Sequence, residues 1–261
     1  MTPPIHEQAA TGFGRAGADY ERGRPGYPEA AVTTLARELG IGPGRVVLDL
    51  AAGTGKLTRA LSGSGAELIG VEPVTGMREQ LVKAVPGARA LDGTAERIPL
   101  PDGAVDAVLV AQAFHWFDAV AAAAEIHRVL RPGGGLGVIW NSWDESVPWV
   151  KQTQALVHEH VNNAPQQRTS PWAKRLAETR LFTALEQRTF PNVVHGDLDT
   201  LLARVASVSY IAALDEPARQ RVLDAVREVV VTDPVTRDRC ELAMPYTTHV
   251  TWCRPTHNLR S

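Results

Sequence analysis

Residues 46–57 read VVLDLAAGTGKL, and this stretch decides the fold. It begins with an apolar run, Val46 to Leu50, that has no regular polar alternation, which is typical of a strand covered on both faces in a parallel sheet. The glycines Gly53 and Gly55 follow, and a helical pattern begins at Lys56. A glycine turn that opens a helix lets the backbone approach a ligand and offers it unpaired amides. We therefore expect a ligand-binding turn directly after the strand.

The same alternation of strand and helix continues on both sides of this stretch. Further strands are predicted at 67–71, 89–91, 104–110 and 136–140, and helices at 29–39, 56–62, 75–84 and 119–130. Beyond Asn141 the rhythm changes: helical patterns are predicted at 150–161, 172–179, 198–214 and 218–231, and a loosely alternating strand at 186–195. Residues 241–253 alternate with period two, which favours a more exposed, antiparallel strand. The chain is thus predicted to be an α/β protein with right-handed βαβ units.

We divide the chain into an N-terminal arm, 1–28, rich in Gly, Pro, Arg and Tyr, and one domain, 29–261. Within that domain, 29–140 forms the expected cofactor-binding half, and 141–261 the expected substrate cap and C-terminal half. No internal repeat or low-complexity tract is visible.

Composition excludes several classes of function. The formal net charge of -2 is unlike the basic excess of a nucleic-acid binder, so no nucleic-acid partner is expected. The apolar runs are too short to span a bilayer, and no signal peptide is visible, so we expect no membrane partner. The two cysteines cannot form a disulfide framework, which favours a cytoplasmic protein. His158 and His160 are poorly spaced for a shared ligand on a helix, and we expect no metal.

Two acidic residues mark the ends of the first two strands. Asp49 lies near the end of its apolar strand, where burial without a partner is costly. Glu72 follows the second strand, and an acidic residue about 20 positions after such a turn commonly binds ribose hydroxyls. The alternative is that the small residues only fill a tight turn and that Glu72 is a solvated strand end. The loop, its spacing and Asp49 together favour the functional interpretation.

At this point the chain resembles the class I methyltransferases that use S-adenosylmethionine (SAM). The family's first motif is an acidic residue followed by three alternate glycines, and here Asp49 precedes Ala51, Gly53 and Gly55, so Ala51 replaces the first glycine. Residues 93–100, GTAERIPL, look like the adenine-framing loop, with Thr94 where many relatives have Asp. Residues 128–134, RVLRPGG, match the structural turn before the fifth strand.

Two further stretches resemble a subgroup of small-molecule enzymes that includes trans-aconitate-type carboxyl methyltransferases. They are YERGRPGYP at 20–28 and AQAFHWFD at 111–118. The resemblance is good over about 10–140 and looser over 141–261. It implies a seven-stranded, mostly parallel Rossmann-like sheet with helices on both faces, an antiparallel last strand and extra helices over the active site. This agrees with the independent interpretation of 241–253.

The resemblance and the strand-end rule together define a candidate site. Asp49 is expected near the SAM ammonium, Glu72 on the ribose and Thr94 with Ala95 around the adenine. The other expected cofactor-binding residues are Ala51, Gly53, Gly55 and Gln112. The expected substrate-binding residues are Tyr20, Arg24, Tyr27, Trp116, Trp140 and Trp143.

The expected reaction is methyl transfer to a small molecule, with a carboxylate or hydroxyl acceptor favoured. A carboxylate needs no general base, whereas a hydroxyl would use His115, the only histidine beside the expected methyl position. The alternative is that His115 and Trp116 form a cofactor or substrate wall or a packed structural pair, and that the surrounding aromatic residues are core and lid packing.

Three rival functions remain open at this stage. An NAD(P)-dependent oxidoreductase shares the glycine loop and the acidic strand end, but its spacing is G-x-G-x-x-G. A protein of the same fold can bind SAM without methyl transfer, because fold does not fix function. An RNA or protein methyltransferase is disfavoured by the missing basic face and by the absence of an Asn-Pro-Pro-Tyr-type segment after the fourth strand.

Overall fold

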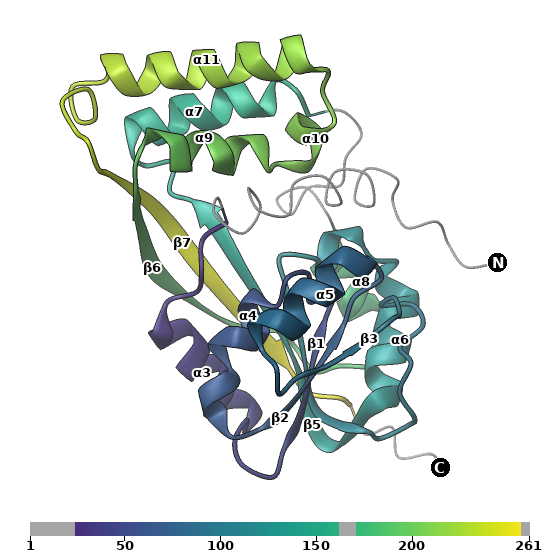
Figure 1. Cartoon of the computed structure of the whole chain (residues 1–261). Coiled ribbons are helices and arrows are strands. Elements are labelled where there is room, and N and C mark those ends of the chain that lie inside the picture. Colours follow the sequence, from purple (N-terminus) through teal and green to yellow (C-terminus); the bar gives the residue numbers. More distant parts are fainter. Residues whose placement is uncertain (1–23, 162–170, 257–261) are drawn as a thin grey trace. The chain divides into compact units, whose positions relative to one another are not determined.

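The computed structural model describes residues 24–161 and 171–256, and Figure 1 shows the course of the chain. The strands are β1 (Val46–Leu50), β2 (Glu67–Val71), β3 (Arg89–Leu91), β4 (Val105–Ala111), β5 (Leu130–Trp143), β6 (Glu186–Gly196) and β7 (Leu242–Cys253). The α-helices are α3 (Glu29–Leu39), α4 (Lys56–Ala60), α5 (Thr75–Ala84), α6 (Ala119–Val129), α7 (Pro148–His158), α8 (Trp172–Glu178), α9 (Leu198–Ala206), α10 (Ser209–Ala212) and α11 (Glu216–Thr232). Two short 3-10 helices are η1 (Ser62–Ser64) and η2 (Phe114–Trp116).

The strands form one seven-stranded sheet in the order β3-β2-β1-β4-β5-β7-β6. The pairs β1–β2, β1–β4, β2–β3 and β4–β5 are parallel. The last two strands along the chain are antiparallel, so the predicted mixed, mostly parallel Rossmann-like sheet is confirmed.

The chain divides into two compact units, which we describe separately. Among the described residues, the sheet unit comprises Gly26–Trp140, 171–190 and 248–256. The helical unit comprises residues 24–25, 141–161 and Pro191–Thr247. Strands β5, β6 and β7 each contribute residues to both units.

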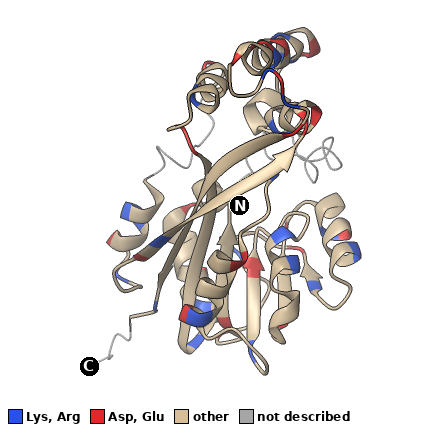
Figure 2. Cartoon of the chain, turned by 90° about the vertical axis from the view of Figure 1, so that its left-hand side faces the viewer, with Lys and Arg blue, Asp and Glu red and all other residues tan. Residues whose placement is uncertain are grey.

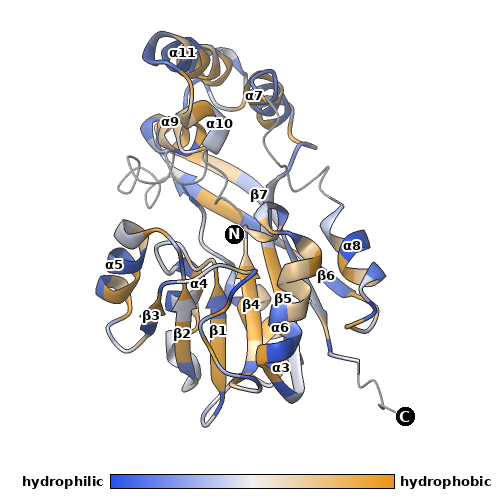
Figure 3. Cartoon of the chain, turned by 90° about the vertical axis from the view of Figure 1, so that its right-hand side faces the viewer, coloured by the Kyte–Doolittle hydropathy of each residue, from blue (hydrophilic) through white to orange (hydrophobic). Residues whose placement is uncertain are grey.

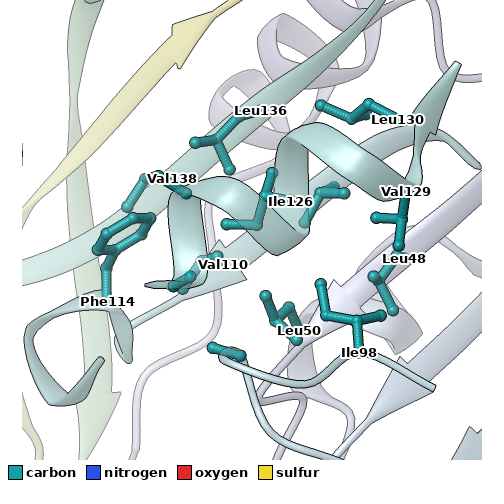
Figure 4. Packing of buried hydrophobic residues seen from close by; sticks show 14 of the residues in the cluster. Leu48, Leu50, Ile98, Val110, Phe114, Ile126, Val129, Leu130, Leu136 and Val138 are labelled. Atoms are coloured by element: carbon teal, nitrogen blue, oxygen red, sulfur yellow. The ribbon is translucent and has the colours of Figure 1, made fainter. Parts of the chain in front are cut away.

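In the sheet unit, two apolar layers cover opposite faces of the parallel strands. Alternation sends Leu48 and Leu50 of β1 into one cluster of buried residues and Val47 into the other. The first cluster includes Ile126 of α6, which Figure 4 shows among the strand residues that it covers. The second includes Leu35 of α3, so helices supply both layers. Strands covered on both faces have no solvent-exposed side to keep polar, and their ribbons are mainly orange in Figure 3.

The helical unit has an apolar core of its own. Helices α7, α9 and α11 turn buried residues toward one another, and the first residues of β7 join them. The core residues are Trp149, Val150, Val157, Leu201, Leu202, Val205, Ile211, Val222, Val226, Val230, Leu242, Met244 and Tyr246. In α11 the buried positions 222, 226 and 230 recur every four residues, as expected for a helix with one apolar face. Asp215 caps this helix by accepting a hydrogen bond from the Ala218 amide at 2.8 Å.

The predicted helix 198–214 is wrong, because the chain leaves the helical conformation between α9 and α10. Val208 is extended, with φ -68° and ψ 128°. The Ser207 hydroxyl donates to the Arg204 carbonyl at 2.8 Å, which satisfies a carbonyl of the last turn of α9. The predicted fifth strand is too short, since β5 begins at Leu130 and has an irregular register before Gly135.

Charged residues of both signs are interspersed on the helices and loops, while the strands carry few (Figure 2). One buried exception, Asp106 of β4, lies at the amino end of the parallel strands. It accepts hydrogen bonds from the Val46 amide at 2.8 Å and from Arg45 and Arg131 at 3.0 and 2.7 Å. Burial alone would raise the pKa of Asp106, but these donors together hold it below its ordinary value. Among the described helices, none is both long and apolar enough to cross a bilayer.

Candidate functional site

The predicted cofactor residues gather at one edge of the parallel strands. Asp49 lies one residue before the end of β1, Glu72 directly follows β2, and Gln112 directly follows β4. Thr94 lies three positions after the end of β3. Because β3, β2, β1 and β4 are adjacent and parallel, their carboxyl ends meet at the same edge. Ligands of open α/β sheets bind at this edge.

The turn after β1 has a repeated left-handed backbone. Ala51, Gly53 and Gly55 have φ values of +57°, +56° and +82°. The alanine in this series carries a Cβ, and this conformation costs an L residue roughly 1–2 kcal/mol. Gln112, at the end of β4, is also left-handed, with φ +59°. Strained residues of this kind cluster at functional sites, and both follow strands at the candidate edge.

Gly53 and Gly55 are needed for different reasons. A Cβ on Gly55 would lie 2.9 Å from Cγ of Leu81 in α5, so this glycine lets α4 and α5 approach closely. A Cβ on Gly53 would meet only the sulfur of Met77, at 4.0 Å. The space beside Gly53 is therefore open to a ligand, whereas Gly55 has a packing role.

Asp49 is a buried carboxylate with one satisfied oxygen. Its Oδ2 accepts hydrogen bonds from the Thr58 amide at 3.1 Å and from the Thr58 hydroxyl at 2.6 Å. Its Oδ1 is buried and has no hydrogen-bond partner among the described residues. Burial raises the pKa of Asp49 to about 7, against the hydrogen bonds from Thr58, which lower it. A positively charged donor at Oδ1 would remove this penalty.

Glu72 links the turns that follow β1 and β2. Its Oε2 accepts from the Gly53 amide at 3.0 Å, and its Oε1 accepts from the Val74 amide at 2.9 Å. Burial raises the pKa of Glu72, and the two amides oppose that rise. Each carboxylate oxygen has a second lone pair that can accept a hydrogen bond from a hydroxyl group. Glu72 can thus hold the loop and bind a diol at once.

Sequence reasoning missed the arginine that fixes the segment after β2. Arg78 of α5 donates from Nη1 to the carbonyl oxygens of Glu72 and Pro73, at 2.7 and 2.8 Å. It also forms an ion pair with Asp92 at 3.2 Å. The only sign of this role in the sequence is that a basic residue, Arg78, lies six positions after the acidic residue Glu72 that follows β2.

The loop after β3 is held by an ion pair on α6. Arg128 donates to the carbonyls of Ile98 and Leu100 at 3.0 and 2.8 Å. Glu125 accepts from the Ile98 amide at 2.9 Å and pairs with Arg128 at 2.7 Å. This pair supports the segment in which Thr94 pairs with Arg97.

Thr94 and Ala95 occupy different environments in this loop. The Thr94 hydroxyl oxygen is buried and has no hydrogen-bond partner among the described residues. Ala95 is buried and belongs to the first apolar cluster of the sheet unit. A polar ligand beside Thr94 could therefore form a hydrogen bond with its hydroxyl. The side chain of Ala95 is in the core, so a ligand could contact only its backbone.

Aromatic residues follow β4 in η2. Phe114 is fully buried and points toward Val138 and Val110 (Figure 4), so it is a core residue. The His115 ring lies 4.9 Å from that of Trp116 and 5.2 Å from that of Trp140, between ring centroids. Trp140 is buried in the core, and its exposed fraction is 2%. The His115 ring therefore packs against a buried tryptophan, Trp140. Trp116 is the more accessible of the two tryptophans.

The expected substrate residues fall into different parts of the structure. Tyr20 lies outside the described residues. Tyr27 packs against the apolar cluster under α3 in the sheet unit. Arg24 and Trp143 belong to the helical unit, where Arg24 Nη2 donates to the Ser207 carbonyl at 3.1 Å. Over the described ranges, no three His, Cys, Asp or Glu residues are grouped as they would be around a metal ion.

Comparison with known proteins agrees with this geometry. Residues 48–138 match the family model described as a methyltransferase domain, and they contain the last three residues of β1, the glycine turn and β4. An uncharacterized methyltransferase of Mycobacterium bovis is 40% identical over 236 residues, which cover 90% of this chain and 92% of the relative. An uncharacterized methyltransferase-like protein of Schizosaccharomyces pombe is 34% identical over 232 residues, covering 88% and 90%.

A solved structure from Anaeromyxobacter dehalogenans, assigned as a type II methyltransferase, has the same fold with a TM-score of 0.65. It is 23% identical to this chain, and the match covers 89% of this chain and 97% of the other. The long, well-covered match to the mycobacterial relative carries the assignment of family, and the solved structure supports the fold. The chain therefore belongs to the class I, SAM-dependent methyltransferase family.

Proposed function

We propose that this protein transfers a methyl group from SAM to a small molecule, with a carboxylate or a hydroxyl as the acceptor. One observation carries the proposal: two buried acids, Asp49 and Glu72, flank a left-handed glycine turn at the carboxyl edge of a parallel sheet. The trans-aconitate-type subgroup, suggested by residues 20–28 and 111–118, is part of the same proposal.

The residues at the edge suit SAM chemically. Asp49 has an unsatisfied buried oxygen for the ammonium of the methionine part, and Glu72 has lone pairs for the ribose hydroxyls. Thr94 has an unsatisfied buried hydroxyl for the adenine amino group, and Gly53 leaves room beside the turn. Gln112, Ala51 and the Ala95 backbone complete the proposed contacts. A buried oxygen without a hydrogen-bond partner costs free energy, so the unsatisfied oxygens of Asp49 and Thr94 support a polar ligand at this edge.

The chemistry requires little of the protein beyond alignment. SAM supplies a methyl group already activated on a sulfonium. The protein's residues then have to hold the acceptor in line and exclude water. A carboxylate acceptor needs no proton removed. A hydroxyl acceptor needs a base, and His115 at the end of β4 would take the proton.

Aromatic and basic residues suggest an acidic or hydroxylated acceptor. Trp116 would contact the acceptor directly, and Trp140 would hold His115 in place. Arg24, Trp143, Tyr20 and Tyr27 are the other substrate-binding residues of the proposal. These roles rest on residue type and local contacts.

Calorimetric titration of SAM tests the assigned turn. Gly53→Val should abolish binding, because its side chain would fill the ligand space. Gly63→Val is the matched control, since a Cβ there meets nothing within 4 Å and the residue lies in η1. Unchanged SAM affinity in Gly53→Val would refute the assignment.

Two rival functions are separated by direct assays. Binding of NAD in place of SAM would favour an oxidoreductase. A SAM-binding protein without transferase activity would leave labelled methyl on SAM with every acceptor in a mass-spectrometric screen. Transfer to any small acid or alcohol by the purified protein would exclude that second rival.

A further inference from the structure

Arg204 of α9 is a buried charge in the apolar core of the helical unit. Its exposed fraction is 8%, and its neighbours Leu201, Leu202 and Val205 belong to the core. Its Nε and Nη1 are buried and have no hydrogen-bond partner in the described parts of the chain. Over residues 24–161 and 171–256, no carboxylate forms a salt bridge with it. Burying a guanidinium without a counter-ion is costly, so Arg204 needs an explanation.

Aromatic residues surround this guanidinium. Its central carbon lies 5.7 Å from the centroid of the Trp143 ring, in a cation–π arrangement. The rings of Trp143 and Tyr246 are 4.4 Å apart between centroids. Burial raises the pKa of Tyr246 to about 12, although the charge of Arg204 and a hydrogen bond with it lower it. Tyr246 is therefore neutral near pH 7 and supplies no negative charge.

A second arginine increases the positive charge. Arg24 donates to the carbonyl of Ser207, three residues after Arg204. The charges of Arg24 and Arg204 both lower the pKa of Tyr210 and of Tyr246, against the effect of burial. Two guanidinium groups thus act on the same pair of tyrosines. We call Arg24, Trp143, Arg204, Tyr210 and Tyr246 the Arg204 cluster; all five belong to the helical unit.

The cluster has what an organic anion requires. A guanidinium is a planar set of donors that matches a carboxylate, and neutral tyrosine hydroxyls can add further donors. Trp143 and Tyr210 are only half-buried, so part of the surface of the cluster is exposed. The aromatic walls suit a molecule with an apolar skeleton better than a small hydrated ion.

We propose that the Arg204 cluster binds a carboxylate group of a small organic acid. Arg204 supplies the charge, Trp143 and Tyr246 form the wall, and Arg24 strengthens the local positive potential. The site belongs to the helical unit alone, so it stands whether or not the proposed function does.

Calorimetric titration of the full chain with acetate, succinate and citrate, without SAM, tests this inference. Succinamide, the uncharged analogue of succinate, is the control ligand. At least one carboxylate should bind, and Arg204→Met should weaken it at least tenfold. Arg227→Met, at an exposed position on α11 of the same unit, should leave it unchanged. Failure of all three acids to bind, or equal affinity in Arg204→Met, overturns the inference.

A purely structural role for Arg204 predicts a different outcome for stability. Without ligand, Arg204→Met should keep or raise the Tm, because an apolar side chain replaces a buried charge that has no counter-ion among the described residues. A lowered Tm with unchanged carboxylate affinity overturns the inference. Should Arg204→Met fail to fold, Arg204→Lys keeps a charge but loses the planar donors, and a threefold or larger loss of affinity is expected. Equal affinity in that variant would count against the cluster.

Other anions are separated by two further titrations. If inorganic phosphate binds through Arg204 and the carboxylates do not, the carboxylate assignment is overturned. If Arg204→Met weakens SAM tenfold, the anion is the carboxylate of SAM, and the assignment of the cluster to a separate organic acid is overturned. If SAM does not bind the unaltered protein while succinate does, the proposed function fails and the anion site stands.

Discussion

The two glycines of the turn after β1 should respond differently to the same added methyl group. In Gly53→Ala the new Cβ meets only the Met77 sulfur at 4.0 Å, so the cost is conformational. A left-handed alanine costs roughly 1–2 kcal/mol. Alanine also reduces the conformational entropy of the unfolded chain, which stabilises the folded state by about 0.4–1 kcal/mol. The free energy of unfolding should fall by about 1 kcal/mol.

In Gly55→Ala the same conformational cost is joined by a clash. The Cβ would lie 2.9 Å from Leu81 Cγ and 3.4 Å from Leu81 Cα, and Leu81 is fully buried. Because the backbone of α5 is also close, Leu81 cannot simply rotate away. Overpacking of a buried core costs about 1–3 kcal/mol. The total loss should be about 2–4 kcal/mol, and its excess over Gly53→Ala measures the contact of α4 with α5.

Urea unfolding of both variants without ligand, followed by circular dichroism, measures these losses. The extra loss of stability in Gly55→Ala should largely disappear when both variants are made in a protein that carries Leu81→Ala, because this substitution removes Cγ of Leu81. Equal losses for the two single variants would refute the division of roles between the glycines. An excess that survives Leu81→Ala would assign it to something other than this contact.

Three other perturbations test the site. Burial raises the pKa of Asp49 to about 7 from an ordinary value of 3.8, so between pH 3.8 and about 7 the folded protein holds one more proton than the unfolded chain. The free energy of unfolding without ligand should therefore fall as the pH rises through this range, by on the order of 4 kcal/mol. Asp49→Asn should flatten the slope of the urea midpoint against pH, with a remainder from Glu72, whose pKa is also raised; an unaltered slope would show that Asp49 does not titrate there. Glu72→Ala should weaken SAM by roughly 1.5–3 kcal/mol, and Glu72→Gln should also weaken it, because the amide NH₂ would face either the Gly53 or the Val74 amide; calorimetry giving parental affinity for both would leave Glu72 as a loop residue only. His115→Ala should cost on the order of a hundredfold in kcat with a hydroxyl acceptor, but about tenfold or less with a carboxylate. A large loss with a carboxylate acceptor would contradict the base-free scheme.

Most of the architecture could be predicted from local patterns. The bounds of β2, β3, α3 and α5 agree with the sequence prediction, because apolar periodicity and Gly or Pro punctuation determine them locally. The break at Val208 could not be seen, since the sequence around it keeps a helical pattern. The long β5 was missed because its pairing with β4, and not its composition, extends it through a glycine-rich segment.

The edge positions of the site were also predictable, because each acid directly ends or follows a strand. The residues that hold the edge in place were not. Arg78 and Arg128 donate to backbone carbonyls, and Arg128 reaches residues 28 and 30 positions away. A basic residue on a helix gives no sign of such a partner before the chain is folded. Arg204 was hidden for the opposite reason, since it interrupts an apolar helix face where a charge is not expected.

The strand order has a consequence for how the protein is made. Strand β7 lies between β5 and β6, yet the ribosome delivers it after both of them. Until it emerges, β5 offers an unpaired apolar edge and β6 has no neighbour to join. Such an edge recruits other nascent chains. We therefore expect prematurely terminated products that lack residues 242–253 to aggregate and not to persist as a smaller working enzyme, even though the glycine turn and both of its acids are already in place.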